Sequence, residues 1–328
     1  MNIVLLDADT IGRDIDLTVF ENLGNVTVYG YSSPEEMRER TKDADVIILN
    51  KMLANDYTLE KASHLKLVCV TATGTNNLDK DYLAHRGIAW RNVAGYSTEC
   101  VTQHTFAMLF YLLEKLPYYD EYVKSEAYVN NTTFTHFSNI FHELWGMTWG
   151  IIGLGAIGRR VAQIASAFGC SVIYYSASGQ HNHPDYERVS FEELLSKSDI
   201  ISVHAPLTER TEGLINRRAF QKMKKSAIFL NLGRGPIVVE KDLADALQAG
   251  ELAAAGLDVL SAEPMQADNP LKTIKDSSKL LITPHIAWAG AETRRRLINI
   301  IWHQIKAFFD TDQPSVSPMD HLFSKDPV

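Results

Sequence analysis

The apolar positions of the first hundred residues fall into short runs separated by polar or helical stretches. These β-rich runs predict five strands, at Ile3–Leu6, Val26–Tyr29, Val46–Leu49, Leu67–Thr71 and Ile88–Val93. Parallel strands need a helical or extended crossover between them because a tight hairpin cannot join them. The pattern therefore predicts a doubly wound unit, a five-stranded parallel sheet covered by helices on both faces.

A long helical pattern follows, from about Thr98 to Leu116. Thr98 is available as its N-cap, and Pro117 is expected to end it. The next stretch, Tyr118 to Leu144, is rich in aromatic residues, Asn and Thr and has weak periodicity. We expect this stretch to be irregular.

A second alternation of strands and helices begins at Thr148. It predicts six strands, at Gly150–Gly153, Val172–Tyr175, Ile200–His204, Ala227–Leu232, Ala254–Val259 and Leu280–Pro284. Helical patterns lie between them, at Ala156–Phe168, Phe191–Lys197, Arg217–Met223 and Lys241–Ala249. Gly250 fits the position that ends the last of these helices. The chain thus predicts a second α/β domain with a parallel sheet.

The final helical pattern, Ala291–Phe309, carries Leu297, Ile301, Ile305 and Phe308 on one stripe. No strand remains after it in the second alternation, so we expect this helix to complete the first domain. The second domain is then an insertion. The predicted boundaries are residues 1–98 plus 290–328 for the first domain and 99–289 for the second.

Composition narrows the function classes. The 328 residues suit two domains of about 150 residues each. Forty acidic against 32 basic side chains give a net charge of −8, which disfavours binding to nucleic acid or an anionic membrane surface. The apolar runs Ile3–Leu6 and Phe106–Leu113 fall well short of the ~20 residues of a membrane span. Cys69, Cys100 and Cys170 are widely spaced, so we expect no disulfide framework, no metal cluster and a cytoplasmic location.

Gly153, Gly155 and Gly158 form a G-x-G-x-x-G motif directly after a predicted strand and at the start of a predicted helix. The first glycine permits the tight turn, the second lets a pyrophosphate approach the backbone, and the third lets helix and strand pack closely. The N–H groups and the dipole of the helix N-terminus favour the anion. The motif predicts a dinucleotide-binding domain at 99–289, and the alternative is an ordinary strand-to-helix turn.

The residue about 20 positions further on bears on the choice between NAD and NADP. An acidic residue there holds the ribose 2′-hydroxyl and repels a 2′-phosphate. Ser176 stands in its place, and nearby hydroxyls, Gln180 and His181 offer hydrogen bonds to a phosphate. The nearest downstream arginine is Arg188, and we expect no arginine close enough to clamp a phosphate. The preference stays open between NAD(H) and NADP(H) and leans towards NAD.

Four polar residues follow the ends of predicted strands, where ligands bind in an open α/β sheet. Arg234 lies on a glycine-flanked turn, and its planar fork of donors suits a substrate carboxylate. His285 ends an apolar strand and suits proton transfer. Glu263 also follows a strand, and a carboxylate beside an imidazole stabilises the protonated ring. Asp258 suits either the nicotinamide end of a cofactor or a cap on the next turn.

These residues lie in motifs that resemble the D-2-hydroxyacid dehydrogenase family. The motifs, in the family's order, are Gly153-x-Gly155-x-x-Gly158, Asn231-Leu-Gly-Arg234-Gly, Gly256-Leu-Asp258-Val with Glu263-Pro264, and Thr283-Pro-His285. Two more lie in the first predicted domain, Thr71-Ala-Thr73-Gly74-Thr75-Asn-Asn-Leu-Asp79 and Asn92-Val-Ala-Gly95-Tyr-Ser-Thr98. The resemblance covers nearly the whole chain. It implies a flavodoxin-like substrate domain, an inserted Rossmann NAD(P)-binding domain, and hydride exchange between a nicotinamide and a 2-oxo or 2-hydroxy acid.

The resemblance also implies roles for individual residues. Arg234 would bind the substrate carboxylate and polarise its carbonyl, His285 would donate the proton, and Glu263 would orient and charge His285. Substrate would also contact Thr73, Gly74, Thr75 and Trp288. The dinucleotide would contact Gly153, Gly155, Ala156, Ile157, Gly158, Ser176, Pro206, Thr211, Leu232, Gly233, Arg234 and Asp258. The chain departs from the family's pattern at Ser176 and at Gln103, where the family often has Glu.

Substrate and partners are expectations from the same resemblance. Trp288 is similar to a residue of the glycerate dehydrogenase and hydroxypyruvate reductase branch, which favours hydroxypyruvate or glyoxylate, with pyruvate or a branched 2-oxo acid as alternatives. Trp288 equally suits a packing role. A homodimer is expected, with contacts from Tyr118–Leu144 and the helix before it. The alternatives to an oxidoreductase are a dinucleotide-sensing corepressor of the same fold and a methyltransferase with a similar glycine loop.

Overall fold

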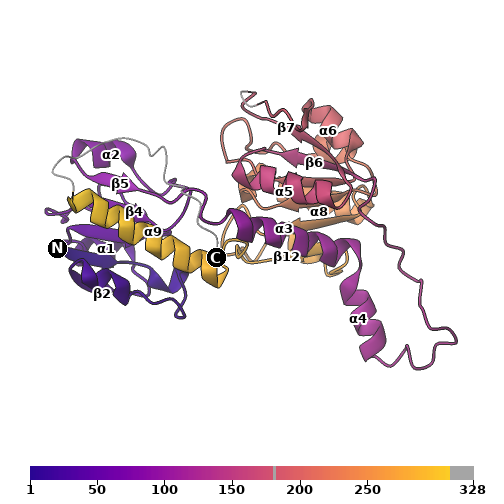
Figure 1. Cartoon of the computed structure of the whole chain (residues 1–328), viewed down its shortest axis with the longest axis horizontal. Helices are drawn as coiled ribbons and strands as arrows, with labels where there is room; N and C mark the ends of the chain where they lie inside the picture. The colour runs from indigo at the N-terminus through magenta and orange to yellow at the C-terminus, as the bar shows by residue number, and fades with distance from the viewer. Residues whose placement is uncertain (180–181, 311–328) are drawn as a thin grey trace. The chain divides into compact units, whose positions relative to one another are not determined.

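The computed structural model describes residues 1–179 and 182–310, and the chain divides into two compact units (Figure 1). The first unit consists of Met1–Tyr96 and the chain from Ala291 onward, and the second of Ser97–Gly290. The closing helix therefore belongs with the first hundred residues.

The first unit is built on a five-stranded sheet in the order β2-β1-β3-β4-β5, and all its strand pairs are parallel. The strands are β1 (Asn2–Leu5), β2 (Asn25–Val28), β3 (Val46–Leu49), β4 (Leu67–Val70) and β5 (Ala89–Arg91). The helices are η1 (Ala8–Thr10), η2 (Thr18–Asn22), α1 (Pro34–Arg40), α2 (Lys80–His85) and α9 (Ala291–Asp310). This strand order is the flavodoxin-like one, as predicted.

Helix α9 packs on the first unit through its predicted stripe. Leu297, Ile301 and Ile305 are buried, whereas Phe308 is only partly buried. Polar contacts add to this packing, since the Arg294 guanidinium donates to the Ile11 carbonyl at 2.8 Å and to the Asp14 carboxylate at 2.6 Å.

The second unit has a seven-stranded parallel sheet in the order β12-β11-β10-β9-β6-β7-β8. The strands are β6 (Thr148–Ile152), β7 (Ser171–Tyr175), β8 (Glu187–Arg188), β9 (Ile200–Val203), β10 (Ile228–Asn231), β11 (Ala254–Leu257) and β12 (Leu280–Ile282). The helices are α3 (Thr98–Leu113), α4 (Leu116–Lys124), α5 (Ala156–Ala167), α6 (Phe191–Lys197), α7 (Arg217–Lys222), η3 (Gly235–Ile237), α8 (Glu240–Ala249) and η4 (Pro270–Thr273). The sheet extends the Rossmann order by one strand and confirms the predicted class. The sequence missed β8 because it has only two residues, both exposed.

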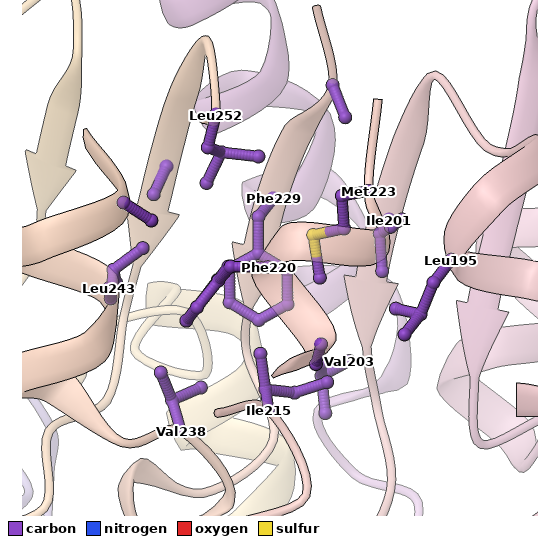
Figure 2. Close-up of a cluster of buried hydrophobic side chains, with 14 of the residues drawn as sticks. Leu195, Ile201, Val203, Ile215, Phe220, Met223, Phe229, Val238, Leu243 and Leu252 are labelled. Atoms are coloured by element: carbon purple, nitrogen blue, oxygen red, sulfur yellow. The ribbon is translucent and has the colours of Figure 1, made fainter. Parts of the chain in front are cut away.

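Apolar clusters cover both faces of this sheet. On one face, α6, α7 and α8 pack around Phe220 and Phe229, whose rings meet edge to face at 5.9 Å (Figure 2). On the other face, α3 and α5 cover a cluster that contains Trp149, whose indole N–H donates to the Ser202 hydroxyl at 2.9 Å. Apolar packing therefore covers the sheet on both faces, and the strands that carry the candidate site are part of this core.

The predicted helix from Thr98 to Leu116 is wrong at its C-terminal end. It stops at Leu113, and Lys115 adopts the left-handed conformation with φ of 56°. Pro117 does not end this helix but lies in the first turn of the next one, α4, where its missing N–H costs nothing. Residue Thr98 is the first helical residue and Ser97 precedes it as the N-cap position, without a side-chain cap.

Candidate active site

The glycine loop after β6 has the geometry that its motif predicts. Gly153 has φ of 94°, and a Cβ atom there would lie 2.7 Å from the backbone nitrogen of Ala205, at the end of β9. A Cβ atom on Gly158 would lie 2.2 Å from the Gly153 carbonyl oxygen. These two glycines let β6, β9 and α5 approach one another closely, so their absence of a side chain is structural.

Gly155 is different, because a Cβ atom there would meet nothing within 4 Å and its φ is an ordinary −76°. It is the N-cap residue of α5 but supplies no side-chain hydrogen bond, and the first turn of α5 has no acidic residue. By contrast, α6 begins with Ser190, which accepts from the Glu193 N–H at 3.2 Å. The N-terminus of α5 therefore keeps its N–H groups and open space for an external anion, and a dinucleotide pyrophosphate fits there.

His204, directly after β9, is a functional candidate that the sequence reading did not assign. Both ring nitrogens are buried, and neither has a hydrogen-bond partner among the described residues. Burial lowers the pKa of this imidazole to about 3, so the ring is neutral at physiological pH. An unpaired buried polar group is costly, and this one lies next to Ala205, which contacts the glycine loop.

Two arginines contact the loop after β7 that carries Ser176, which corrects the expectation that no arginine lies near this residue. Strand β8 pairs in parallel with β7 and brings Arg188 back to the loop, where its guanidinium donates to the Gly179 carbonyl at 2.9 Å. Arg210, in the segment after β9, donates to the Ser178 carbonyl at 3.4 Å. The Ser176 and Ser178 hydroxyls lie 3.3 Å apart. Gln180 and His181 lie outside the described residues.

Within residues 1–179 and 182–310, neither Arg188 nor Arg210 forms an ion pair with a carboxylate, and both guanidinium groups donate to carbonyls of the loop after β7. The sequence signal was hidden because Arg210 is 34 positions beyond Ser176 and Arg188 returns only through the short pairing of β8 with β7.

The remaining residues predicted at the dinucleotide lie on the strand ends around the glycine loop. Ala156 and Ile157 are the first residues of α5. The Thr211 hydroxyl is buried and donates to the Pro206 carbonyl at 2.7 Å, so it shapes its own loop. After β10, Leu232 is buried, and a Cβ atom on Gly233 would lie 2.9 Å from the Ala205 carbonyl oxygen.

Arg234 lies on a turn that its neighbours fix. The Asn231 side chain donates to the Arg234 carbonyl at 3.0 Å and accepts from the Gly233 N–H at 3.1 Å. A Cβ atom on Gly235 would lie 1.9 Å from the Leu260 carbonyl, so only glycine lets this turn approach the loop after β11. The guanidinium donates to the Gly233 carbonyl at 2.8 Å. Its remaining donors suit a carboxylate ligand.

Glu263 and His285 are brought together from two strand ends. One carboxylate oxygen of Glu263 lies 2.7 Å from His285 Nδ1, and the other accepts from the Leu260 N–H at 3.0 Å. The carboxylate therefore fixes Nδ1 as the protonated nitrogen, and Nε2 is the nitrogen that remains for a ligand. Both side chains are partly exposed, at 27% for His285 and 32% for Glu263.

His285 itself has φ of 55°, an uncommon conformation for a residue with a side chain. The buried Asp258 stabilises this turn. Its carbonyl accepts from the His285 N–H at 2.8 Å, and its carboxylate accepts from the N–H groups of Ile286 and Ala287 at 2.9 Å each. Asp258 therefore caps the turn that carries His285, which follows the neighbouring strand β12 and is not the next turn along the chain that the sequence suggested.

The residues predicted to contact substrate fall in both units. Thr73, Gly74 and Thr75 follow β4 in the first unit, where the Thr73 hydroxyl donates to the Val93 carbonyl at 2.9 Å. Trp288 lies in the second unit and packs, partly buried, against the cluster beneath α3 and α5. That contact fits the packing role that the sequence left open for it. Gln103 is exposed on α3.

Within residues 1–179 and 182–310, the structure has neither a helix suited to crossing a membrane nor a cluster of side chains suited to holding a metal ion. No helix there combines the length and the apolar character that crossing a membrane requires. No group of three or more His, Cys, Asp or Glu side chains there is arranged to hold a metal ion.

Comparison with known proteins places the chain in a family. Residues 106–287 match the family model described as D-isomer specific 2-hydroxyacid dehydrogenase, NAD binding domain. The hydroxypyruvate reductase of Blautia hydrogenotrophica is 38% identical over 317 residues, which cover 94% of this chain and 97% of that protein. The glycerate dehydrogenase of Methylorubrum extorquens is 34% identical over 276 residues, covering 84% of this chain and 86% of that protein.

A solved structure agrees with these relatives. The D-lactate dehydrogenase of Aquifex aeolicus, complexed with NAD and lactic acid, is 27% identical and superimposes with a TM-score of 0.82, over 94% of this chain and 96% of that one. The matched NAD binding domain and the open glycine loop indicate a nicotinamide dinucleotide as the cofactor. The chain belongs to the D-isomer specific 2-hydroxyacid dehydrogenase family and is an oxidoreductase that acts on the CH–OH group of its donor.

Proposed function

We propose that this protein reduces a small 2-oxo acid to the D-2-hydroxy acid, with hydroxypyruvate and glyoxylate as the preferred substrates. The observation that carries the proposal is the 2.7 Å contact between Glu263 and His285 Nδ1 on a turn at the carboxyl end of the sheet. An imidazole held in this way is a proton donor with a fixed orientation and a stabilised charge.

Each polar residue has one task in this reaction. Arg234 binds the substrate carboxylate and draws electron density from the 2-oxo group, because its fork of donors matches a planar anion. His285 gives the proton on Nε2 to the developing alkoxide, and Glu263 stabilises the imidazolium before that transfer. A bound reduced nicotinamide supplies the hydride.

The substrate choice rests on the two curated relatives, named hydroxypyruvate reductase and glycerate dehydrogenase. Oxidation of NADH and NADPH by the purified protein, measured in parallel against hydroxypyruvate, glyoxylate, pyruvate and 2-oxoisocaproate, tests it. We expect the highest kcat/KM on hydroxypyruvate or glyoxylate. A preference for 2-oxoisocaproate would overturn the small-substrate proposal, and dinucleotide binding without turnover on any acid would favour a sensing protein of the same fold.

We propose further that the cofactor site accepts NADPH as well as NADH. Ser176 adds no negative charge to the loop after β7, and the cationic side chains of Arg188 and Arg210 both contact that loop. A 2′-phosphate there would gain two charge-assisted partners. Because of these two arginines, we no longer favour NAD(H) over NADP(H) as the sequence alone did.

Dissociation constants for NADH and NADPH, measured by fluorescence titration, test this cofactor proposal. Arg188→Ala and Arg210→Ala should each weaken NADPH binding about tenfold, the loss of one charged hydrogen bond, while NADH binding stays within about twofold. Arg218→Ala, at an exposed arginine of α7, is the control. Equal losses for both dinucleotides would contradict a phosphate-specific role.

We propose that the protein is a homodimer and that residues 116–146 form the contact; we call this segment the arm. Figure 1 shows α4 and the chain after it standing away from the sheet of the second unit. Within the arm, Tyr122 stacks on His136 at 3.8 Å, so the arm has packing of its own. Yet Phe134, Phe137 and Ile140 are 90%, 79% and 77% exposed. Such a concentration of exposed apolar side chains is typical of an interface.

Sedimentation equilibrium of the wild type and of a Phe134→Ser/Phe137→Ser variant tests the arm. The variant should become monomeric and keep its thermal stability per chain, because both side chains are exposed in the single chain. A dimer that persists unchanged would place the contact elsewhere.

We infer a reducing compartment, the cytoplasm, from the cysteines. Cys69, Cys100 and Cys170 are all free, and burial raises the pKa of Cys69 to about 12 and that of Cys170 to about 11. Fractionation of cells that carry the tagged protein tests this inference, and recovery outside the cytoplasm would contradict it.

A further inference from the structure

A side chain of α3 lies at the base of the His285 turn. His104 Nε2 is 3.0 Å from the Thr283 hydroxyl oxygen, and that hydroxyl donates to the Asp258 carboxylate at 2.6 Å. His104 and Thr283 are 179 positions apart in the chain, so this contact exists only in the folded second unit. His104 is 20% exposed and Asp258 only 2% exposed, which keeps the chain of contacts largely out of water.

The direction of each hydrogen bond follows from the donors available. The Asp258 carboxylate, when ionised, only accepts, so the single hydroxyl proton of Thr283 is used in the 2.6 Å bond to it. The hydroxyl oxygen can then only accept from His104, and the proton of the imidazole is therefore on Nε2. His104 thus determines which way the Thr283 hydroxyl points.

The Thr283 bond matters for the site because of what else the carboxylate holds. The oxygen that accepts from Thr283 also accepts from the Ile286 N–H, and the second oxygen accepts from the Ala287 N–H. These two amides follow His285 directly, and His285 is in the left-handed conformation. A shift of the carboxylate would therefore move or loosen the turn that presents the imidazole.

We propose that His104 is a positioning residue for His285 and acts through Thr283 and Asp258. Its effect on the turn is transmitted by the Thr283 hydroxyl and the buried Asp258 carboxylate, and its Nε2 also lies 3.7 Å from an oxygen of that carboxylate. The kinetic part of this proposal rests on the proposed proton-donor role of His285, whereas the structural part stands without it. Without the Nε2 donor, the Thr283 hydroxyl is free to rotate, and Asp258 loses a fixed partner.

Hydrogen exchange at the backbone amides of Ile286 and Ala287, in the full-length protein, tests the structural part directly. His104→Leu should speed exchange at these amides about tenfold, because their acceptor is less well held. His104→Gln, whose amide nitrogen is also a donor, should restore most of the protection. Gln103→Ala, at the exposed neighbouring position on α3, is the matched control and should leave exchange unchanged.

A double-mutant cycle with Thr283→Val tests the route. If His104 acts through the hydroxyl, the exchange rates of Thr283→Val and of the His104→Leu/Thr283→Val double variant should be the same. Additive effects would overturn the relay, as would unchanged exchange in His104→Leu.

Steady-state kinetics test the consequence for the reaction. His104→Leu should lower kcat about 10- to 100-fold, the usual effect of a misplaced reacting group, with the dissociation constant for the dinucleotide within about threefold. Faster exchange with unchanged kcat would overturn the positioning role, although His285 would keep its own. If the wild type turned over no oxo acid but exchange changed as expected, the proposed function would fail while the contact network would stand.

Discussion

Each of the two parallel sheets has a point where its strand order reverses. A side chain of the protein occupies the backbone donors at one of these points, whereas backbone donors stay open at the other. In the first unit the reversal lies between β1 and β3, and Asp7, just after β1, fills the crevice. Its buried carboxylate accepts from the Asn50 N–H at 2.9 Å and from the Lys51 N–H at 2.8 Å. In the second unit the reversal lies between β6 and β9, and there Gly155 leaves the α5 N–H groups free.

The two units share a reversal of strand order but differ in whether backbone donors beside it remain available to a ligand. Both reversals create a crevice at the carboxyl ends of the strands, where open α/β sheets bind ligands. In the first unit the protein's own carboxylate takes the N–H groups, and burial raises the pKa of Asp7 against the opposing effect of those hydrogen bonds. In the second unit the N–H groups at the start of α5, after β6, are left for an anion from solution. The two reversals therefore differ in whether the protein's own carboxylate already occupies the nearby backbone donors.

The largest expected effect distinguishes the proposed proton donor from the residues that bind the dinucleotide. His285→Ala should lower kcat on hydroxypyruvate about 1000-fold, since it removes the proposed proton donor, while the dinucleotide dissociation constant stays within about twofold. Stopped-flow kinetics and fluorescence titration measure the two quantities. Wild-type turnover in this variant would remove His285 from the reaction.

The next prediction concerns a variant of the second unit that carries a carboxylate beside its backbone donors, as Asp7 does in the first unit. Gly155→Asp should weaken dinucleotide binding about 100-fold or more, because its carboxylate would occupy the α5 N-terminus and repel the pyrophosphate. The ordinary φ of Gly155 and the open space around it should let the variant fold. Isothermal titration calorimetry measures the affinity, and Gly155→Ala, which adds bulk without charge, should lose much less. Equal losses in the two variants would mean that bulk rather than charge decides.

The converse change removes the Asp7 carboxylate from the first unit. Asp7→Ala should destabilise the protein by about 3 kcal/mol, because it leaves the buried N–H group of Asn50 and the partly buried N–H group of Lys51 without an acceptor. Asp7→Asn keeps an acceptor oxygen and should cost less than half as much. Urea denaturation measures both values. If Asp7→Ala were as stable as the wild type, the carboxylate would have no role in closing this crevice.

The smallest effect concerns the unpaired imidazole beside the open crevice. The pKa of His204 is about 3 in the folded chain, against about 6.5 in the unfolded chain. The unfolded chain therefore binds a proton first as the pH falls below 6.5, and stability should decline by up to about 1.4 kcal/mol per pH unit down to pH ~3. Comparing denaturation of the wild type and His204→Leu between pH 7 and 5 isolates this term. His303→Gln, at an exposed histidine of α9, is the control, and parallel curves for all three proteins would contradict it.

Much of the fold could be predicted from sequence because its signals are local. Short apolar runs marked the strands of both sheets except β8, and the stripe of α9 predicted a helix that buries Leu297, Ile301 and Ile305. The glycine loop carried its chemistry in its own spacing. The break at Lys115 was missed because nothing in the local pattern requires a left-handed residue there.

The parts of the site that escaped prediction depend on residues distant in the chain. Arg188 reaches the ribose loop only through the pairing of β8 with β7, and His104 meets Thr283 across 179 positions. The capping of the His285 turn by Asp258 became visible only when its hydrogen bonds to that turn were placed. Sequence could name the candidate residues at each strand end, but the folded sheet decides which of them share a hydrogen bond.

The most direct test of the central claim is the identity of the reaction product. The wild-type protein is incubated with hydroxypyruvate and reduced dinucleotide, and the glycerate formed is resolved by chiral chromatography. The proposed arrangement predicts the D-isomer, in amounts equal to the dinucleotide oxidised. Formation of the L-isomer, or no product under conditions where calorimetry shows the dinucleotide bound, would contradict it.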